Sequence, residues 1–410
     1  MEKGGNRDAV VSTSLMNQHH DDATLLQKLR WSLPWLIRYP FWRARQLLIP
    51  ASESNDQTHV IFLVANHYEP GVGAQAIPRV EKWIQLARET GNAIRDHDGT
   101  PFRHTNFYPA EQYERPLLEL LAGLQAEGFG EVEIHLHHGV EAPDTAENTK
   151  RVLEEFRDRL VEDHKCLSRE TKDSPVMYGF VHGNWALANS AGGRWCGVDS
   201  EMRVLAETGC YADFTLPSTP HQSQVSRINA IYECGHPLDQ AKPHRSGPSV
   251  RTGRQPSLPI IFEGPLVFDW SRRIRTLPVP RIDDGALAQN YPLNIDRFER
   301  WRSAGVRVAG RRNWIFVKLY SHGFFDWDQD AMMGAQMRRF MNEVLDLAEK
   351  TGSFRVHFAS AREAFNMVMA AVDGHTGSPG RYRNYKLRQV MEIHSARAPE
   401  PQLSEITTSD

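Results

Sequence analysis

Cysteine is scarce in this sequence of 410 residues, which contains only four. No two of them have CxxC spacing, and none has partner histidines at the intervals of a zinc finger, so the spacing excludes a finger-type zinc site. Because the count is even, two disulfides remain conceivable. We expect the simpler state, in which Cys166, Cys196, Cys210 and Cys234 are reduced thiols of a cytoplasmic protein.

Long apolar runs and an excess of one charge are also missing. Residues 1–25 are polar, include Asp21 and Asp22, and lack the continuous apolar core of a secretory signal. No later stretch has the length of an uninterrupted apolar membrane span. The 48 basic and 51 acidic residues give a net charge of -3, so nothing favours nucleic acid as the main partner. We therefore expect a catalytic domain that stays in the cytoplasm.

What the chain does contain is an alternation of short apolar runs and amphipathic patterns. β-branched or alternating runs predict strands, and apolar residues at helical spacing predict helices. The expected strands cover 59–65, 132–137, 177–181, 228–232, 260–262, 314–320 and 354–358, and the expected helices cover 111–127, 148–164, 200–208, 330–350 and 361–371. Strands that alternate with helices predict an α/β fold with parallel strands joined by crossover helices.

Composition divides the chain into four parts. We expect a disordered polar tail at 1–23, a basic and aromatic segment at 24–57, a folded body at 58–373 and a loosely ordered tail at 374–410. Residues 236–259, rich in Pro, Ser, Gly and Arg, predict a long loop inserted at the surface of the body. An α/β barrel can take up a body of this length as one domain.

Histidines gather where the expected strands end. The carboxyl ends of parallel strands converge on one face of an α/β sheet or barrel, which is where active sites form. Imidazoles at the ends of four separate strands are the strongest functional signal in the sequence. The residues are His67 and Glu69 after the strand at 59–65, His135, His137 and His138 at the end of 132–137, His182 after 177–181, and His322 after 314–320.

The spacing of these residues favours a metal site. His135 and His137 lie two residues apart in an expected strand, so their side chains can share one face. Two imidazoles on one rigid element, together with a carboxylate such as Glu69, are typical of an open zinc site. The alternative is that one histidine is a satisfied core residue while the others face water. Glu69 itself has a plainer interpretation, because the Pro-Gly pair that follows it predicts a solvated turn.

Several segments together resemble a known family. They are an acidic residue after the first strand, the Glu-Ile-x-x-His pattern of 133–137, Tyr-Gly-Phe-Val-His-Gly-Asn-Trp at 178–185, the helix-Gly-Asp stretch of 201–215, Lys-Leu-Tyr-Ser-His-Gly at 318–323, and the final helix at 361–371. Their order, over about 58–370, resembles the polysaccharide deacetylase superfamily, carbohydrate esterase family 4. The resemblance implies a distorted (β/α) barrel of the polysaccharide deacetylase and glycoside hydrolase-deacetylase type.

The chain departs from the family pattern at three places. The paired aspartates after the first strand are replaced by His67 and Glu69. The second motif has two histidines four residues apart, whereas here His137 is followed at that distance by Glu141, with His135 and His138 as alternative donors. An arginine and a proline after the third motif strand are replaced by the segment His-Gly-Asn-Trp at 182–185.

The resemblance implies a metal-dependent hydrolase that removes an N-acetyl or similar acyl group from a sugar or glycan precursor in polysaccharide metabolism. A divalent ion, Zn²⁺ or alternatively Ni²⁺ or Co²⁺, would lower the pKa of a bound water. The implied metal ligands are Glu69, His135 and His137. The implied catalytic residues are His67 as general base or fourth ligand, His322 as the acid for the leaving amine, and His182.

For substrate binding we expect Asn184, Trp185 and His138, with Trp195 and Trp270 as further sugar-stacking candidates. Two other functions remain open. The missing aspartates are compatible with a catalytically lapsed barrel that binds glycan or organises partners at a membrane. A metal-dependent phosphoester hydrolase would need more carboxylates near the histidines than the sequence offers.

A basic and aromatic segment precedes the body. Residues 28–50 hold three tryptophans, seven large aliphatic residues and four arginines without an acidic residue. Tryptophan beside arginine suits the headgroup region of a membrane, with short helices broken at Pro34 and Pro40. The alternative is a strap that wraps the body. Membrane attachment on the cytoplasmic face would make a lipid-linked glycan an attractive substrate.

Overall fold

The computed structural model describes residues 23–48, 57–235, 237–324 and 328–394. The expected tail at 1–23 therefore lies almost wholly outside the described residues, as does the end of the tail at 374–410. Within the described part, nine strands form one sheet in the order β13-β1-β2-β3-β5-β6-β8-β7, and β14 also pairs with β1. All of these pairings are parallel except that between β7 and β8.

The strands of this sheet are β1 (Thr58–His67), β2 (His104–Pro109), β3 (Gly130–Leu136), β5 (Tyr178–His182), β6 (Cys210–Asp213), β7 (Ile231–Glu233), β8 (Ile260–Phe262), β13 (Trp314–Ser321) and β14 (Phe354–Ala359). The helices are α2 (Leu25–Leu47), α3 (Ala76–Ala93), α4 (Arg115–Ala126), α5 (Ala146–Glu162), α6 (Glu201–Thr208), α7 (Ile295–Ala304), α8 (Gln329–Met333), α9 (Ala335–Thr351), α10 (Ala361–Val372) and α11 (Val390–His394). Short strand pairs are β4 (Ser168–Arg169) with β15 (Arg388–Gln389), β9 (Val267–Asp269) with β12 (Arg281–Asp283), and β10 (Arg273–Ile274) with β11 (Leu277–Pro278).

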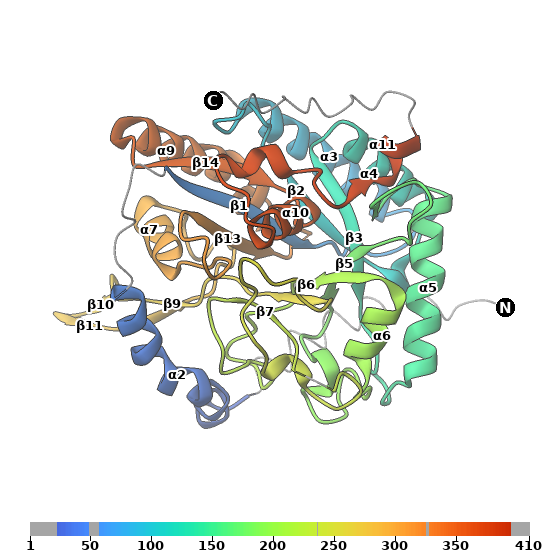
Figure 1. Ribbon diagram of the computed structural model, residues 1–410, viewed down its shortest axis with the longest axis horizontal. Coiled ribbons are helices and arrows are strands. Elements are labelled where there is room, and N and C mark those ends of the chain that lie inside the picture. The colour runs from blue at the N-terminus through green and yellow to red at the C-terminus, as the bar shows by residue number, and fades with distance from the viewer. Residues whose placement is uncertain (1–22, 49–56, 236, 325–327, 395–410) are drawn as a thin grey trace, which may run out of the picture.

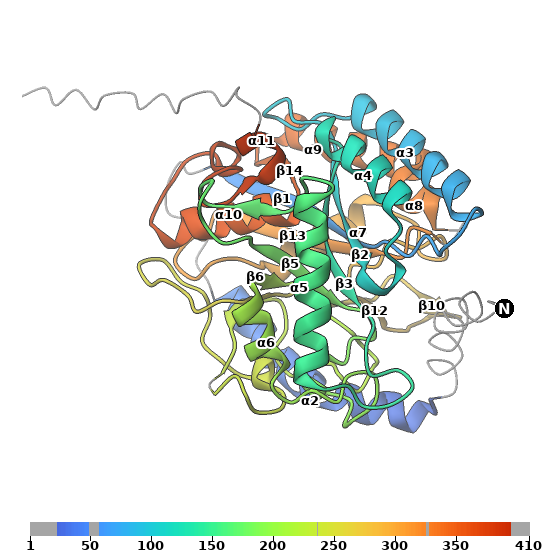
Figure 2. The same cartoon turned by 90° about the vertical axis from the view of Figure 1, so that its right-hand side faces the viewer.

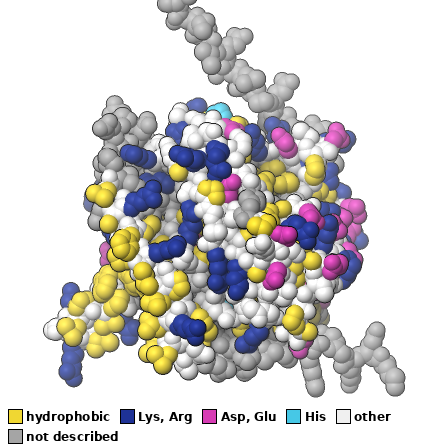
Figure 3. Space-filling view, turned by 60° about the horizontal axis from the view of Figure 1, so that its bottom comes forward, with side chains coloured by type: hydrophobic (Ala, Val, Ile, Leu, Met, Phe, Trp, Pro, Cys, Tyr) yellow, Lys and Arg dark blue, Asp and Glu magenta, His cyan; other side chains and the backbone are white. Residues whose placement is uncertain are grey.

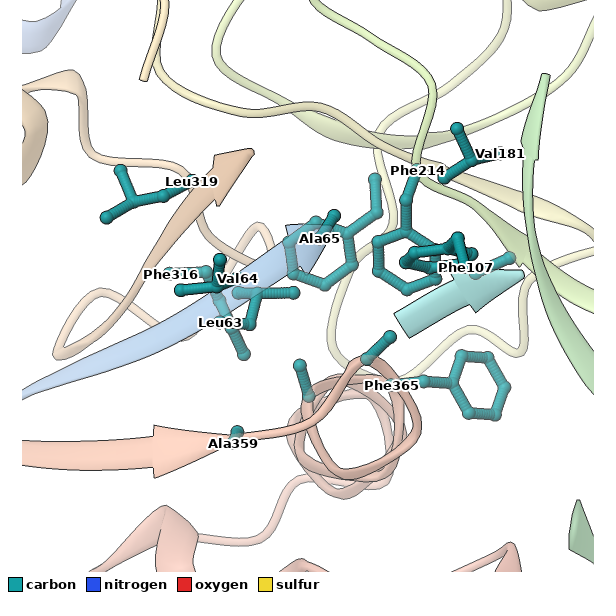
Figure 4. Close-up of a cluster of buried hydrophobic side chains, with 14 of the residues drawn as sticks. Leu63, Val64, Ala65, Phe107, Val181, Phe214, Phe316, Leu319, Ala359 and Phe365 are labelled. Atoms are coloured by element: carbon teal, nitrogen blue, oxygen red, sulfur yellow. The ribbon is translucent and has the colours of Figure 1, made fainter. Parts of the chain in front are cut away.

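The predicted α/β class is confirmed, with strands in the centre of the molecule and helices around them (Figures 1 and 2). β1 is buried along nearly its whole length, as an apolar run covered on both faces should be. Side chains from β1, β2, β13 and α10 meet in the core shown in Figure 4, where Phe107 and Phe214 pack with ring centroids 5.7 Å apart. The strand pairing does not by itself show closure into a barrel.

Several elements differ from the sequence prediction, which gave neither α3 nor α7. The sequence pattern gave no strand at His104–Pro109, yet this segment forms β2 between β1 and β3. Its six residues are all buried, but their mixture of His, Thr, Asn and Pro hides the apolar signal of a strand. The single helix expected at 330–350 is two helices that meet at Gly334, where a Cβ atom would lie 2.2 Å from the Asp330 carboxylate.

The described part of the C-terminal tail is not loosely held, which corrects the prediction for residues 374–394. Arg362 of α10 pairs with Glu131 at 2.8 Å and donates hydrogen bonds to the carbonyl oxygens of Arg383 and Leu387. Arg383 in turn pairs with Asp96 at 2.8 Å. Polar composition suggested a solvated tail, but here the polar groups bind buried partners.

Residues 236–259 likewise do more than loop over the surface. The backbone N–H of Glu233 donates to Pro248, and that of Val250 donates to Ile231, so this segment pairs with β7. The side chains of His244 and Val250 are fully buried. These residues are buried because their backbone pairs with β7, which could not be predicted from their content of Pro, Ser and Gly.

The basic and aromatic segment forms α2, which begins with a capping box at Thr24 and continues through both prolines. Trp35 is fully buried against Ile228 and Leu266, and the Tyr39 ring packs on the same side with its centroid 4.7 Å from that of Phe268. Helix α2 therefore straps the body through one face. None of the described helices is long and apolar enough to cross a bilayer.

Replacing Trp35 should show how much the packing of α2 on the body contributes to the free energy of unfolding. Trp35→Ala removes a fully buried ring and leaves a cavity, so the free energy of unfolding should fall by about 3–5 kcal/mol. Leu33→Ala is the matched control on the same helix, because Leu33 is 48% exposed and should cost less than about 0.5 kcal/mol. Urea unfolding measures both, and equal effects would contradict the packing of α2.

Candidate metal-binding site at the edge of the sheet

The parallel register brings the four histidine-bearing strand ends to one edge of the sheet. β1 ends at His67, β3 is followed by His137, β5 ends at His182, and β13 is followed by His322. β1 pairs with β13 and reaches β3 through β2, so side chains distant in sequence lie side by side. Two groups of ligand-type side chains result.

The first group, called the edge cluster, consists of His67, Glu69, His135, His137 and His322. The Glu69 carboxylate oxygen Oε1 lies 3.3 Å from Nε2 of His135 and 3.5 Å from Nε2 of His137. The ring centroid of His67 lies 5.0 Å from that of His135 and 4.5 Å from that of His322. Ligand atoms of His67, Glu69 and His135 all fall within 4.8 Å of one another, a spacing that fits one metal ion.

Hydrogen bonds on the far side of each ring orient the two central histidines. Nδ1 of His135 lies 2.9 Å from the Val181 carbonyl oxygen, which can only accept, so this nitrogen carries the proton. Nδ1 of His137 lies 2.5 Å from the Glu111 carboxylate. In both residues Nε2 then faces Glu69. In metal sites, a carbonyl or carboxylate bound to the far ring nitrogen orients a histidine in the same way, so that its other nitrogen can bind the ion.

The His137 ring packs directly against the backbone of Gly183. A Cβ atom at Gly183 would lie 2.3 Å from Cδ2 of His137, so any larger residue would displace the ring. Gly183 follows β5 directly, and its N–H donates to the Leu136 carbonyl of β3. Gly183, the glycine of the His-Gly-Asn-Trp segment, thus leaves room for the ring of His137, which follows the neighbouring strand β3.

Charges in the edge cluster offset one another. Burial raises the pKa of Glu69, but the hydrogen bond with His135 and the charges of His137 and His322 outweigh it and lower the pKa to about 2. Burial lowers the pKa of His137, but Glu111 and Glu69 outweigh it and raise that pKa to about 8. Burial and the neighbouring histidines lower the pKa of His67 well below its usual value, and burial also lowers that of His322.

An aromatic and amide rim borders the edge cluster. The Trp185 ring centroid lies 6.4 Å from that of His322 and 5.6 Å from that of His221, and Trp195 contacts His221 at 5.5 Å. Trp185 and Trp195 both have positive φ, a costly conformation for bulky residues that is found most often at functional sites. Among the described residues, neither side-chain atom of the buried Asn184 amide has a hydrogen-bond partner.

The second group, called the buried cluster, consists of His138, His182, Cys196 and Glu201, whose ligand atoms could hold a metal ion. His138 lies between two carboxylates, 3.0 Å from Asp144 and 2.9 Å from Glu201. Burial lowers the pKa of His138, but Glu201 and Asp144 outweigh it and raise the pKa well above the usual value. A metal ion in this cluster would therefore compete with a proton on His138.

The structure brings together all three predicted metal ligands and two of the predicted catalytic histidines, His67 and His322, in the edge cluster. His182 and His138 instead belong to the buried cluster, where Nε2 of His182 lies 3.6 Å from Glu201. Trp185 and Asn184 lie on the rim, whereas Trp270 lies beside Phe268 next to the short β10–β11 pair. All four cysteines are buried and unpaired.

Three acidic residues of the site could not be found from the strand-end pattern. Glu111 lies in a short 3-10 turn after β2, and Glu201 begins α6, so neither stands at a predicted strand end. Asp144 lies in the loop before α5. Glu141, at the second-motif position, is exposed and lines a cavity of about 350 Å³ beside His137 and Glu111.

The fold and these two clusters define an α/β protein with a mostly parallel sheet and ligand-type side chains at the carboxyl edge of its strands. Compared with protein-family models and with curated proteins, the chain matches no family model and no curated protein. The geometry of the site is therefore the main indication of what the protein does.

The pKa of His137 predicts a pH dependence of the metal-free protein. The folded-state pKa of about 8 lies above the unfolded value of 6.5, so the stabilisation is complete below pH 6.5 and is lost as pH rises through 8. The loss should be at most about 2 kcal/mol. Unfolding measured across this range should show the decrease, and NMR should give the same pKa for the His137 ring. Glu111→Gln should lower this pKa; an unchanged value would contradict the role of Glu111.

Proposed function

We propose that this protein is a metal-dependent hydrolase that removes an N-acetyl or similar acyl group from a sugar or glycan precursor. The observation that carries the proposal is the convergence of Nε2 of His135 and Nε2 of His137 on one oxygen of Glu69. A carboxylate and two imidazoles with oriented far nitrogens form the open donor set of a hydrolytic metal site. The acetylated-sugar substrate follows from the family resemblance of the sequence motifs.

The donor set fits Zn²⁺, with Ni²⁺ or Co²⁺ as alternatives. Glu69, His135 and His137 would hold the ion, and His67, whose buried Nδ1 has no hydrogen-bond partner among the described residues, offers a fourth nitrogen. When bound, such an ion supplies Lewis acidity that lowers the pKa of a water molecule and polarises a carbonyl oxygen.

The chain's own residues supply the proton transfers and the positioning of substrate. His67 and His322 have lowered pKa values and are neutral at pH 7, so His322, or His67 where it is not the fourth ligand, can accept the proton of the attacking water. The proton can then pass to the leaving nitrogen as the amide bond breaks. The Asn184 amide is available to hydrogen-bond a substrate hydroxyl or acyl oxygen, and the Trp185 ring offers a stacking face.

Contacts across the molecule favour the distorted barrel that the resemblance implies. β8 and β13 stand near opposite ends of the strand order, yet the rings of Phe262 and Phe316 are 5.4 Å apart. Lys318 of β13 donates to the carbonyl oxygens of Phe214 and Leu216, which follow β6. These contacts are those expected where a curved sheet brings its two ends together.

Elemental analysis of paired variants tests where the metal binds. His137→Ala removes a proposed ligand and should abolish stoichiometric Zn²⁺, Ni²⁺ or Co²⁺ while circular dichroism stays unchanged. His182→Gln is the matched control in the buried cluster and should keep the metal. The reverse result would place the ion in the buried cluster and contradict the proposed site. A metal-free parent protein that binds glycan would favour the lapsed barrel.

His322 has a separable role in turnover. His322→Asn keeps a polar side chain but removes the titratable ring, so kcat for deacetylation should fall by about 10²–10⁴-fold. Metal content should be unchanged, because His322 is not among the proposed ligands. Loss of metal would make it a ligand, and unchanged kcat would exclude it from proton transfer.

A further inference from the structure

In the described part of the chain, the large hydrophobic side chains that are exposed are confined to two neighbouring segments. Every large hydrophobic side chain that is exposed in the described part of the chain belongs to α2 and the residue after it or to residues 270–277 around the β10–β11 hairpin. These side chains are Leu25, Leu26, Leu29, Leu33, Ile37, Phe41, Leu48, Trp270, Ile274 and Leu277. We name this set the docking face. Monomeric proteins rarely leave such a set uncovered.

Helix α2 has two apolar faces, and only one is used by the fold. Trp35 and Tyr39 point inward to Phe268, whereas Leu29, Leu33 and Ile37 follow one another at intervals of four residues on the outer face. The inward contacts fix the rotation of the helix. Leu29, Leu33 and Ile37 therefore point away from the body, and packing against the body does not explain why these three residues are apolar.

The hairpin extends the same face. The N–H of Phe268 at the start of this segment donates to the Tyr39 hydroxyl, which joins β9 to α2. Ile274 and Leu277 are directly opposite each other across the β10–β11 pair and are 55% and 71% exposed. An isolated two-stranded hairpin gains little stability from its own side chains. The stability of the fold therefore does not account for the apolar residues at the tip of this hairpin.

The charged residues within the two segments of the docking face are all basic. Arg30, Arg38 and Arg45 are exposed on α2, and Arg272, Arg273 and Arg275 are exposed on the hairpin. Neither 23–48 nor 270–282 contains an Asp or Glu. In Figure 3, hydrophobic side chains gather on the left of the molecule and acidic side chains lie mostly on the right, while basic side chains are spread across the view.

We propose that the docking face binds the surface of an anionic phospholipid bilayer. Apolar side chains bordered by arginines match acyl chains below negatively charged headgroups. A second copy of the chain fits less well, because a two-fold contact would set the same arginines against one another without an acidic partner. The attachment is peripheral, with α2 lying along the surface and the tip of the hairpin inserted.

Docking would also bring the rim of the edge cluster close to the headgroups. Trp31 of α2 contacts His221 at 6.2 Å, and Ser32 lies 3.4 Å from Thr219 through their hydroxyl oxygens. His221 in turn contacts Trp185 and Trp195 on the rim. A glycan anchored in the same bilayer by a lipid could then reach the site, a step that depends on the proposed function, whereas vesicle binding does not.

Co-sedimentation of the full-length protein with vesicles tests the docking face. Vesicles of equal parts phosphatidylcholine and phosphatidylglycerol should sediment the protein at low salt, and high salt should weaken but not abolish binding. The variant Arg38→Gln, Arg45→Gln, Arg273→Gln should bind roughly a hundredfold more weakly, since each arginine near the surface contributes about fivefold. The variant Leu29→Ser, Ile37→Ser, Phe41→Ser should lose the binding that resists salt.

The matched control removes three exposed arginines from helices far from the docking face in sequence. Arg88→Gln, Arg115→Gln, Arg151→Gln has the same change in charge, so its binding should stay within about twofold of the parent if position decides. Equal loss in this control would overturn the proposal, as would a parent protein that stays in the supernatant at low salt. A parent dimer that the serine variant converts to monomer would assign the face to a second copy instead.

Discussion

Burial of the Glu69 carboxylate is the constraint around which the edge of the sheet is organised. A carboxylate that is 8% exposed cannot remain charged without partners, since removal of an isolated charge from water costs far more than a domain's net stability. His135 and His137 supply those partners, and they are held in turn by the Val181 carbonyl and the Glu111 carboxylate. The same arrangement that stabilises the free protein also leaves two ring nitrogens facing one oxygen.

The adjacent residues His137 and His138 divide the site into two electrostatic environments. His137 faces the edge cluster, and His138 faces Asp144 and Glu201 in the buried cluster. In the buried cluster the Glu201 carboxylate also accepts a hydrogen bond from the Ala188 N–H at 2.6 Å, so its charge is already satisfied by the protein. Each cluster retains a buried ring nitrogen without a hydrogen-bond partner among the described residues, Nδ1 of His67 in the edge cluster and Nε2 of His182 in the buried cluster.

Helix α2 lies between the rim of the edge cluster and the surface of the molecule. Its inner face fills a hydrophobic cluster with Ile228 and Leu266, and its outer face presents leucines to the surroundings. The two interpretations of this segment, a strap and a membrane contact, are therefore compatible, because they use opposite sides of one helix. The ring contacts from Trp31 through His221 to Trp185 connect that helix to the rim of the edge cluster.

The sequence by itself determined the alternation of strands and helices and the presence of histidines at four strand ends. This succeeded because β1 and β13 are apolar runs with clear ends, and because parallel strands must present those ends on one edge. From this pattern the approach of Glu69, His135 and His137 could be predicted.

Only the tertiary structure decided which side chains complete each cluster. Glu111, Cys196 and Glu201 come from turns and a helix start, and their place depends on how distant segments pack rather than on local periodicity. Strand β2 was hidden by its polar residues, which are buried only inside the sheet, where Asn106 accepts a hydrogen bond from the Asn66 amide. The tail after Gly374 is held by Arg362 and Arg383, whose pairing with buried acids cannot be seen in composition, because charge becomes structural only once a partner lies within reach.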